Sequence, residues 1–303
     1  MTDTFPEIGR LVHLEHVNFT VDDHDLATVF LMGGLGFTRD PYKRTDHHNM
    51  GVNVGMQQFH LPLRSRPTPP FPGVVGLIVP DLKAVRERLG YIEKDGHFKG
   101  TPYKTQMKAG ALEIVSPFGV ALRLHQAGKL AFQRPVGIPY VDIHVAPGSA
   151  RPLARYYRQV MGCPASVGKL GGETVCRVTV GPNQELRFRE RDGIDHDLHN
   201  FHVAIYTADY NALRDTAQAN ASFMGDARDQ TFFLDRLYDP DNGETILRFQ
   251  HEMRGLFHAD YMRQLVNRWP MPTEPFEDQG AIRRAQLAAM ARKPEKKKRK
   301  RKR

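Results

Sequence analysis

The feature that most constrains this chain is a pattern that occurs four times along its 303 residues. Each copy reads as an alternating strand, a polar turn and an amphipathic helix, followed by short strands that end in a turn and a closing strand. Four aligned copies favour one duplicated βαβββ unit over an unrelated α+β fold. The copies open at residues 14–37, 73–90, 138–163 and 201–218.

The spacing between equivalent positions is nearly constant. His16 and Tyr140 are 124 positions apart, and Val74 and His202 are 128 apart. The closing strands keep the same interval, since Arg123 and Arg248 are 125 apart. The second half of the chain is therefore predicted to repeat the first.

Alternation along the opening strands separates polar from apolar side chains, because residues two apart lie on one face of a strand. In the third copy Tyr140, Asp142 and His144 share the polar face. The opening strand of the fourth copy adds His202 and Tyr206. These polar faces are candidates for a binding cleft.

A single βαβββ unit exposes one face of its sheet and has to pair with a second unit to close a core. We predict that consecutive units pair, so that the chain is an α+β protein with two domains. The segments that follow are expected to be a helical extension and a disordered tail. The predicted boundaries are 8–127 for the first domain, 136–253 for the second, 254–291 for the extension and 292–303 for the tail.

The positive charge of the chain is confined to its end. The net charge is +9, and residues 292–303 alone contain ten Lys or Arg and one Glu, so residues 1–291 are balanced. Such a run cannot bury apolar surface. It indicates either a solvated tail or a contact with nucleic acid or another acidic partner, and for the folded body it predicts nothing.

Other general features bound the setting of the protein. Cys163 and Cys176 are too few for a disulfide framework, which favours a reducing compartment. No signal-peptide pattern or membrane-length apolar run is present. We expect a cytoplasmic protein, or a nuclear one if the cell is eukaryotic and the basic tail is an import signal. The helical extension is expected to pack on the body, with a homodimer contact as the alternative.

The module order and the motifs that bound each module resemble the vicinal oxygen chelate superfamily, which includes glyoxalase I, bleomycin-resistance proteins and extradiol dioxygenases. The resemblance covers residues 10–252 and rests on the openings HVNFTV and FHVAIYTADYNAL and on the endings SPFG…LRL and DPDNGETILRF. It implies half-barrel domains whose two modules curve round a cleft. This scaffold hosts many reactions, so it does not define an activity.

The resemblance also implies a divalent metal, Fe, Mn, Zn or Ni, held by inward residues of the opening and closing strands. The family's closing-strand Glu is absent from both projected clefts, and Arg123 and Arg248 stand there instead. The register across the last turn is uncertain by one residue. Projected onto this sequence, the inward positions are His16, His60, Val74 and Arg123 in the first domain and Tyr140, Arg187, His202 and Arg248 in the second.

In the first cleft, His16 and His60 are either metal ligands, an acid–base pair or two histidines with a structural role. The guanidinium of Arg123 disfavours a second cation beside it and cannot itself ligate. The structural interpretation is therefore favoured there over a metal site.

In the second cleft, three interpretations stay open. His144 and His202, with Asp142 or Glu185, could form a two-His-one-carboxylate metal site. Alternatively, arginines could bind a carboxylate or phosphate, with tyrosines and histidines completing the pocket, or they could pair with acidic residues as structural ion pairs. The residues of the second interpretation are Arg187, Arg248, Tyr140, Asp142, His144 and Tyr206.

Two functions follow from the resemblance. The first is an enzyme acting on a small oxygenated or anionic metabolite by lyase, isomerase or oxygenase chemistry. In a metal-free version His16 or His202 would act as general base while Arg123 or Arg248 stabilises negative charge. The second is a non-catalytic protein that binds and sequesters a small molecule, as resistance proteins on this scaffold do.

Overall fold

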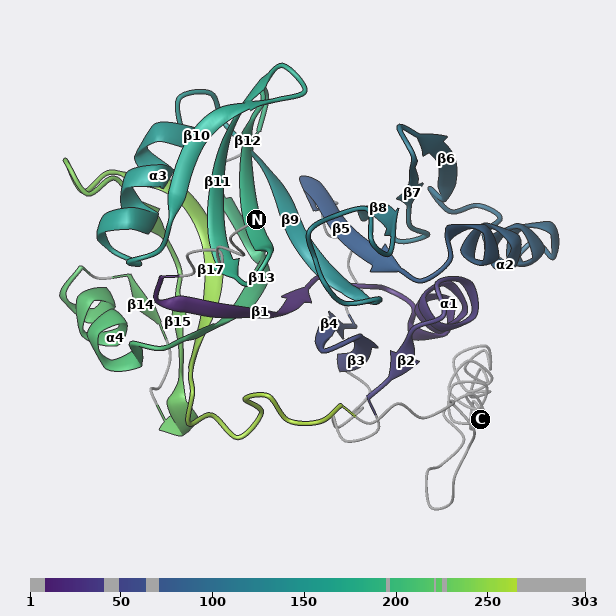
Figure 1. Cartoon of the computed structure of the whole chain (residues 1–303), viewed down its shortest axis with the longest axis horizontal. Coiled ribbons are helices and arrows are strands. Elements are labelled where there is room, and N and C mark those ends of the chain that lie inside the picture. Colours follow the sequence, from purple (N-terminus) through teal and green to yellow (C-terminus); the bar gives the residue numbers. More distant parts are fainter. Residues whose placement is uncertain are drawn as a thin grey trace, which may run out of the picture. The chain divides into compact units, whose positions relative to one another are not determined.

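The computed structural model describes residues 9–40, 49–63, 71–194, 197–220, 222–224 and 228–265. In this part of the chain each of the four segments forms a βαβββ module, as predicted (Figure 1). The first module consists of β1 (Leu11–Asn18), α1 (His24–Thr28), η1 (Val29–Gly34), β2 (Thr38–Arg39), β3 (Asn49–Val54) and β4 (Gln57–Pro62). The second consists of β5 (Gly73–Val79), α2 (Leu82–Lys94), β6 (Lys104–Lys108), β7 (Ala111–Val115) and β8 (Ala121–Gln126).

The third and fourth modules repeat this order with one extra short strand and a 3-10 turn in the last. The third consists of β9 (Gly137–Val145), α3 (Ala150–Gln159), β10 (Ala165–Leu170), β11 (Glu173–Gly181) and β12 (Gln184–Glu190). The fourth consists of β13 (Asp197–Thr207), α4 (Tyr210–Ala219), β14 (Phe223–Met224), η2 (Arg228–Gln230), β15 (Thr231–Leu234), β16 (Leu237–Tyr238) and β17 (Thr245–Gly255).

The helices begin where the sequence places capping residues. The side chain of Asp81 accepts hydrogen bonds from the backbone N–H groups of Lys83 and Ala84, at the start of α2. Asp23 caps α1 in the same way. Each cap lies between an opening strand and the helix that follows it, where the chain changes from strand to helix.

The modules combine into two sheets. One sheet has the order β14-β15-β17-β13-β1-β4-β3-β2, with β16 beside β17, and contains the fourth and first modules. The other has the order β10-β11-β12-β9-β5-β8-β7-β6 and contains the third and second modules. Below we call them the first sheet and the second sheet. In each, the opening strands of the two modules pair antiparallel, β1 with β13 and β5 with β9.

This pairing corrects the expectation that consecutive modules share a sheet. Each sheet takes one module from residues 8–127 and one from residues 136–253, so those ranges describe the duplication and not the sheets. The short connection between β8 and β9 brings the second and third modules together. Every module presents the same open edge, its opening strand, so the repeat pattern by itself is compatible with either pairing.

Two glutamines join the sheets through buried hydrogen bonds. Gln57, the first residue of β4, donates to the carbonyls of Leu14 and Ile138. Gln184, the first residue of β12, donates to the carbonyl of Leu14 and accepts from its N–H. The two glutamines, which begin equivalent strands of the first and third modules, thus satisfy backbone groups of the opening strands β1 and β9.

The segment after β17 differs from its prediction. Residues 256–262 form turns where a helical extension was expected to begin. The turn is held by the N–H of Asp260, which donates to Nδ1 of His258, and by Tyr261, whose ring lies edge-on to Tyr206 at 4.9 Å. The rest of the predicted extension and the whole basic tail lie outside the described residues.

Candidate metal centre

The inner face of the first sheet gathers three histidines from three strands. His16 lies on β1, His60 on β4 and His202 on β13. All three are mostly or fully buried; His202 is the most open, with 17% of its side chain exposed. The pairing of the first and fourth modules therefore unites residues that the sequence had assigned to different clefts.

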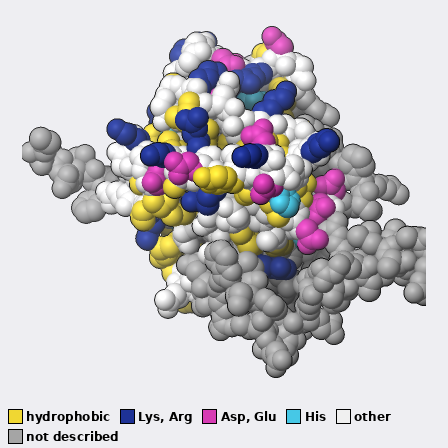
Figure 2. All heavy atoms as spheres, turned by 90° about the vertical axis from the view of Figure 1, so that its right-hand side faces the viewer, with side chains coloured by type: hydrophobic (Ala, Val, Ile, Leu, Met, Phe, Trp, Pro, Cys, Tyr) yellow, Lys and Arg dark blue, Asp and Glu magenta, His cyan; other side chains and the backbone are white. Residues whose placement is uncertain are grey.

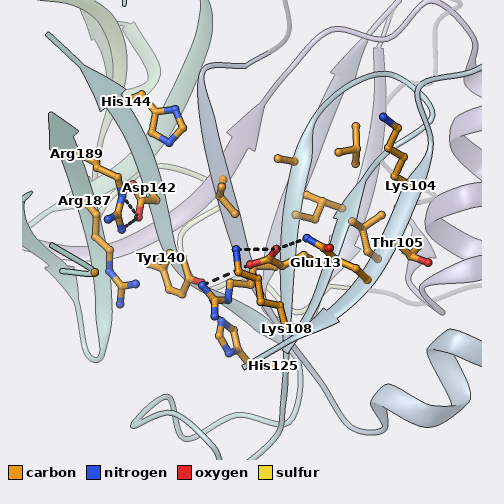
Figure 3. Close-up of a pocket in the computed structure, with 18 of the residues that line it drawn as sticks. Lys104, Thr105, Lys108, Glu113, His125, Tyr140, Asp142, His144, Arg187 and Arg189 are labelled. Atoms are coloured by element: carbon orange, nitrogen blue, oxygen red, sulfur yellow. Dashed lines mark hydrogen bonds and ion pairs between the residues drawn. The ribbon is translucent and has the colours of Figure 1, made fainter. Parts of the chain in front are cut away.

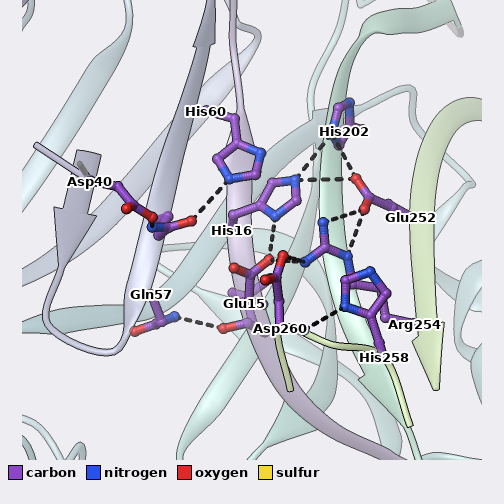
Figure 4. A network of polar contacts seen from close by, with 12 residues as sticks. Glu15, His16, Asp40, Gln57, His60, His202, Glu252, Arg254, His258 and Asp260 are labelled. Atoms are coloured by element: carbon purple, nitrogen blue, oxygen red, sulfur yellow. Dashed lines mark hydrogen bonds and ion pairs between the residues drawn. The ribbon is translucent and has the colours of Figure 1, made fainter. Parts of the chain in front are cut away.

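Glu252 on β17 completes a compact group with two of these histidines (Figure 4). The Nε2 atoms of His16 and His202 are 3.2 Å apart. The Glu252 Oε2 atom lies 3.3 Å from the first and 3.4 Å from the second. We call these three residues the His–His–Glu triad.

A second set of charged residues, Glu15 and Arg254, contacts the triad and orients its side chains. The Nδ1 of His16 is hydrogen-bonded to the Glu15 carboxylate, which places the Nδ1 proton there and leaves the Nε2 lone pair for the triad. Arg254 donates to Glu15 at 3.0 Å and to Glu252 at 2.6 Å. One guanidinium thus orients both carboxylates, and two negative charges face one positive charge.

The pKa shifts agree with this arrangement. Burial lowers the pKa of His202, which keeps the imidazole neutral and able to donate a lone pair. Burial alone would raise the pKa of Glu252, but His16, His202 and Arg254 hold it well below its usual range. Burial lowers the pKa of Arg254, but the neighbouring Glu15 and Glu252 more than reverse this and raise it.

The donor set fits a divalent metal. Adjacent ligands about 2.1 Å from a metal are themselves about 3 Å apart, close to the 3.2–3.4 Å separations of the triad. A histidine ligand usually donates its other ring N–H to a carboxylate, as His16 does to Glu15. The excess of carboxylate over guanidinium also favours a cation.

His60 is placed beside the triad and not in it. Its ring stacks on that of His16, with centroids 3.6 Å apart and planes 27° apart. Imidazole lone pairs lie in the ring plane, so two stacked rings cannot both direct one at the same ion. His16, His60 and Glu15 do lie close enough together to count as a second cluster of potential ligands, but the stacking opposes it.

A chain of amides fixes the orientation of His60. The side-chain nitrogen of Gln58 donates to Asp40 and Asn53, both at 2.7 Å. Its oxygen therefore faces the Nε2 of His60 at 3.1 Å and accepts the proton there. His60 is held as the tautomer whose acceptor atom is Nδ1.

Sequence reasoning missed Glu252, Glu15 and Arg254. Glu252 shares a strand face with Arg248, four residues earlier, so alternation alone could have found it. Glu15 could not be found that way, because it is the extra residue of a β-bulge between Leu14 and His16. The bulge breaks the alternation and lets neighbouring residues face the same interior.

Several predicted site residues lie elsewhere. Arg248 is half-exposed, 3.7 Å from Asp235, and about 13 Å along the strand from Glu252, so it does not face the triad. Tyr206 is fully buried against the turn after β17. The predicted metal site of His144 and His202 does not form, because these residues are on different sheets. The pairing of His16 with Arg123 is wrong for the same reason.

The remaining predicted residues line a separate cavity of about 1200 Å³ on the second sheet (Figure 3). Arg187 lies over the ring of Tyr140, with 3.7 Å between its Cζ atom and the ring centroid. Asp142 accepts from Nε of Arg189 at 3.0 Å, which matches the structural ion-pair interpretation for that carboxylate. The cavity is lined by Arg123, His125, Tyr140, Asp142, His144, Arg187 and Arg189, among others.

Comparison with known proteins identifies the fold. Glyoxalase I from Zea mays is 13% identical over 84% of this chain and 95% of its own length, with a TM-score of 0.58. A provisionally assigned dioxygenase from Bacillus subtilis is 15% identical over 94% of this chain and 97% of its own, with a TM-score of 0.53. No family model matches the chain. No curated protein sequence matches it either.

The likeness spans both halves of the chain and nearly the whole of each neighbour. The chain therefore has the fold of the vicinal oxygen chelate superfamily, as its motifs predict. Within the described residues, no helix combines the length and apolar character needed to cross a membrane.

Proposed function

We propose that this chain is a metal-dependent enzyme that holds a divalent cation at His16, His202 and Glu252 and acts on a small oxygenated metabolite. The observation that supports this most directly is the mutual distance of 3.2–3.4 Å between the three ligand atoms. Two imidazoles and one carboxylate with further positions open are the donor set of non-haem Fe(II) oxygenases. Oxygenase chemistry is therefore favoured here over lyase or isomerase chemistry.

When bound, such an ion supplies Lewis acidity and open positions for two adjacent oxygen atoms of a substrate. The chain supplies the surroundings. Glu15 and Arg254 orient the ligands from a buried, poorly solvated position, where charges interact strongly. These contacts fix the orientation of His16 and Glu252.

His60 is the residue best placed to move a proton. It is buried beside the triad, and Gln58 holds its Nε2 proton. A histidine beside the site of a bound substrate can take a proton from a substrate hydroxyl and return it later. We propose His60 as general base, in place of the metal-ligand role considered from the sequence.

The first experiment measures metal content. Wild type, His202→Ala and His144→Ala are incubated anaerobically with Fe²⁺, Mn²⁺, Zn²⁺ or Ni²⁺, desalted and assayed. We expect about one ion per chain in wild type and in His144→Ala, whose change lies on the other sheet, and loss of the ion in His202→Ala. Equal metal in wild type and His202→Ala would refute the site.

The second experiment measures turnover. Oxygen uptake with aromatic diols is compared with product formation from thiol adducts of α-oxo aldehydes, for wild type and for His60→Gln. Turnover of diols that falls in His60→Gln while the metal content is unchanged supports the oxygenase with His60 as base. Metal binding without turnover of either class would favour the alternative function, non-catalytic binding of a small molecule.

A further inference from the structure

The two sheets present equivalent positions to their inner faces, and strand register shows which residues correspond. In the first sheet His16 is opposite Ala204, and Ala204 is opposite Glu252. In the second sheet Tyr140 is opposite Gly76, and Gly76 is opposite Arg123. Tyr140 therefore occupies the position of His16, and Arg123 that of Glu252.

The same register gives the other two positions. His60 is opposite Asn18, and Arg187 is opposite Asp142, each two residues further along the opening strand. His202 is likewise matched by Val74. The second sheet thus replaces two imidazoles and a carboxylate by a phenol, an isopropyl group and a guanidinium, and replaces the stacked His60 by a second guanidinium.

A stacked pair is present at this place in both sheets, although the groups that form it differ. The rings of His16 and His60 are 3.6 Å apart, and the Arg187 guanidinium is 3.7 Å from the ring of Tyr140. A guanidinium stacked on an aromatic ring keeps its N–H groups in one plane, which suits a planar carboxylate or a phosphate. The guanidinium of Arg187 therefore lies in the second sheet where the ring of His60 lies in the first.

Both arginines have donor capacity that the protein leaves unused. The Nε of Arg123 is buried and has no hydrogen-bond partner among the described residues, and its NH1 is 3.8 Å from Glu113. Arg187 uses Nε to bind Glu185 at 2.8 Å, and within the described part of the chain no bond is seen from its terminal nitrogens. The buried Nε of Arg123, which has no partner among the described residues, favours an incoming acceptor.

The other charged groups of this cavity are mostly paired with one another. Arg189 is bound to Asp142 and Glu173, and Arg191 is bound to Glu173. His125 hydrogen-bonds to the Tyr140 hydroxyl at 2.8 Å, and burial together with Arg123 and Arg187 lowers the pKa of His125 to about 4. At neutral pH Arg123 and Arg187 are thus guanidiniums of the cavity that keep N–H groups unpaired among the described residues.

Two further cationic side chains lie at the edge of the cavity. Lys104 and Lys108 of β6 line its rim and are exposed. Figure 2, which views the molecule from the side of β6, β7 and α2, shows Lys and Arg side chains on this face with Asp and Glu side chains between them. The charges of Lys104 and Lys108 attract small anions.

We propose that the inner face of the second sheet is a metal-independent site for a small organic anion, whose carboxylate or phosphate is bound by Arg123 and Arg187 beside Tyr140. A cavity of about 1200 Å³ is larger than the anionic group needs, so this group is the end of a larger molecule. The site is separate from the triad and does not depend on the function proposed for it.

The experiment is calorimetric titration of chelator-treated full-length protein at fixed ionic strength with inorganic phosphate, phenyl phosphate and benzoate. We expect at least one to bind, and the order of affinity to separate phosphate from carboxylate ligands. Arg123→Gln and Arg187→Gln should each weaken binding at least tenfold. Arg191→Gln, which removes a guanidinium already paired with Glu173, should change it less than about twofold.

Three outcomes would overturn the proposal: no binding of any probe, an equal loss in Arg191→Gln, or loss of binding in His202→Ala. The last would place the anion on the first sheet, whereas retained binding in that variant separates this inference from the metal site. If Arg187→Gln fails to fold, Arg187→Lys keeps the charge and removes the forked donor. Unchanged binding in a folded Arg187→Lys would refute forked recognition.

Discussion

Arg123 occupies in the second sheet the position that Glu252 occupies in the first, because each lies directly across from a small residue of the adjacent opening strand, Gly76 of β5 or Ala204 of β13. The duplicated scaffold therefore places a carboxylate on the inner face of one sheet and a guanidinium on the inner face of the other. The charge at this position is therefore reversed between the sheets, which supports our proposals of a cation at the first and an anion at the second.

The support for the triad can be tested without removing a ligand. Glu15→Gln keeps the shape of the side chain but removes the charge that holds the Nδ1 proton of His16. We expect metal affinity to fall by about 10- to 100-fold, measured by competition with a coloured chelator. Glu113→Gln, the matched change on the second sheet, should leave the affinity unaltered. An unchanged affinity in Glu15→Gln would contradict the role assigned to Glu15.

Removal of Arg254 should destabilise the metal-free protein strongly. Arg254→Met leaves the buried carboxylates of Glu15 and Glu252 without their shared partner, at a cost of about 3 to 5 kcal/mol in the free energy of unfolding. Arg214→Met removes a surface arginine from Asp215 and should cost less than about 1 kcal/mol. Urea denaturation of both variants measures the difference. Similar losses in the free energy of unfolding would show that the contacts of Arg254 with Glu15 and Glu252 add little to stability.

Acid stability should depend on His251. This side chain is fully buried, its Nδ1 donates to the carbonyl of Phe249, and its Nε2 accepts from the hydroxyl of Tyr157 at 2.6 Å. Burial lowers its pKa from 6.5 to about 4. Below pH 6.5 the unfolded chain therefore binds a proton at this side chain that the folded chain does not bind until the pH approaches 4. Stability attributable to His251 is present above pH 6.5 and is lost as the pH falls towards 4.

The expected loss is about 3 kcal/mol between pH 6.5 and pH 4, at up to about 1.4 kcal/mol per pH unit. The double variant His251→Leu with Tyr157→Phe removes both members of the hydrogen bond and should flatten that part of the pH profile. Tyr157→Phe alone keeps the histidine and serves as control. If the free energy of unfolding falls with the same slope between pH 6.5 and pH 4 in all three proteins, other groups control the loss of stability in acid.

Gly76 should be required for the Tyr140 side of the anion site. A Cβ atom at this position would meet the Tyr140 ring, so Gly76→Ala should destabilise the fold by about 1 to 3 kcal/mol and weaken anion binding. Gly90 lies exposed in α2, where an added methyl group would have nothing within 4 Å, so Gly90→Ala should stabilise the protein by about 0.5 to 1 kcal/mol. Thermal unfolding of both variants measures these changes. Equal shifts of the melting temperature in Gly76→Ala and Gly90→Ala would contradict the close contact.

Much of the fold was accessible from the sequence because it depends on local chemistry. Alternation identified the opening strands, and Asp23 and Asp81 cap the helices that follow them. The inward direction of His16, His60 and His202 also followed from alternation. The partners of these histidines did not, because the edges of four similar modules are equivalent in sequence and only the assembled chain shows which edges meet.

The sequence by itself determined the βαβββ modules, their duplication and the residue types available on each strand, since these depend on the period of the strand and on nearby turns and caps. Only the tertiary structure decided that the first module joins the fourth, that a bulge turns Glu15 towards His16, and that Glu252 and not Arg248 reaches the triad. Register and sheet pairing are set by long-range packing and buried hydrogen bonds, which no local pattern encodes.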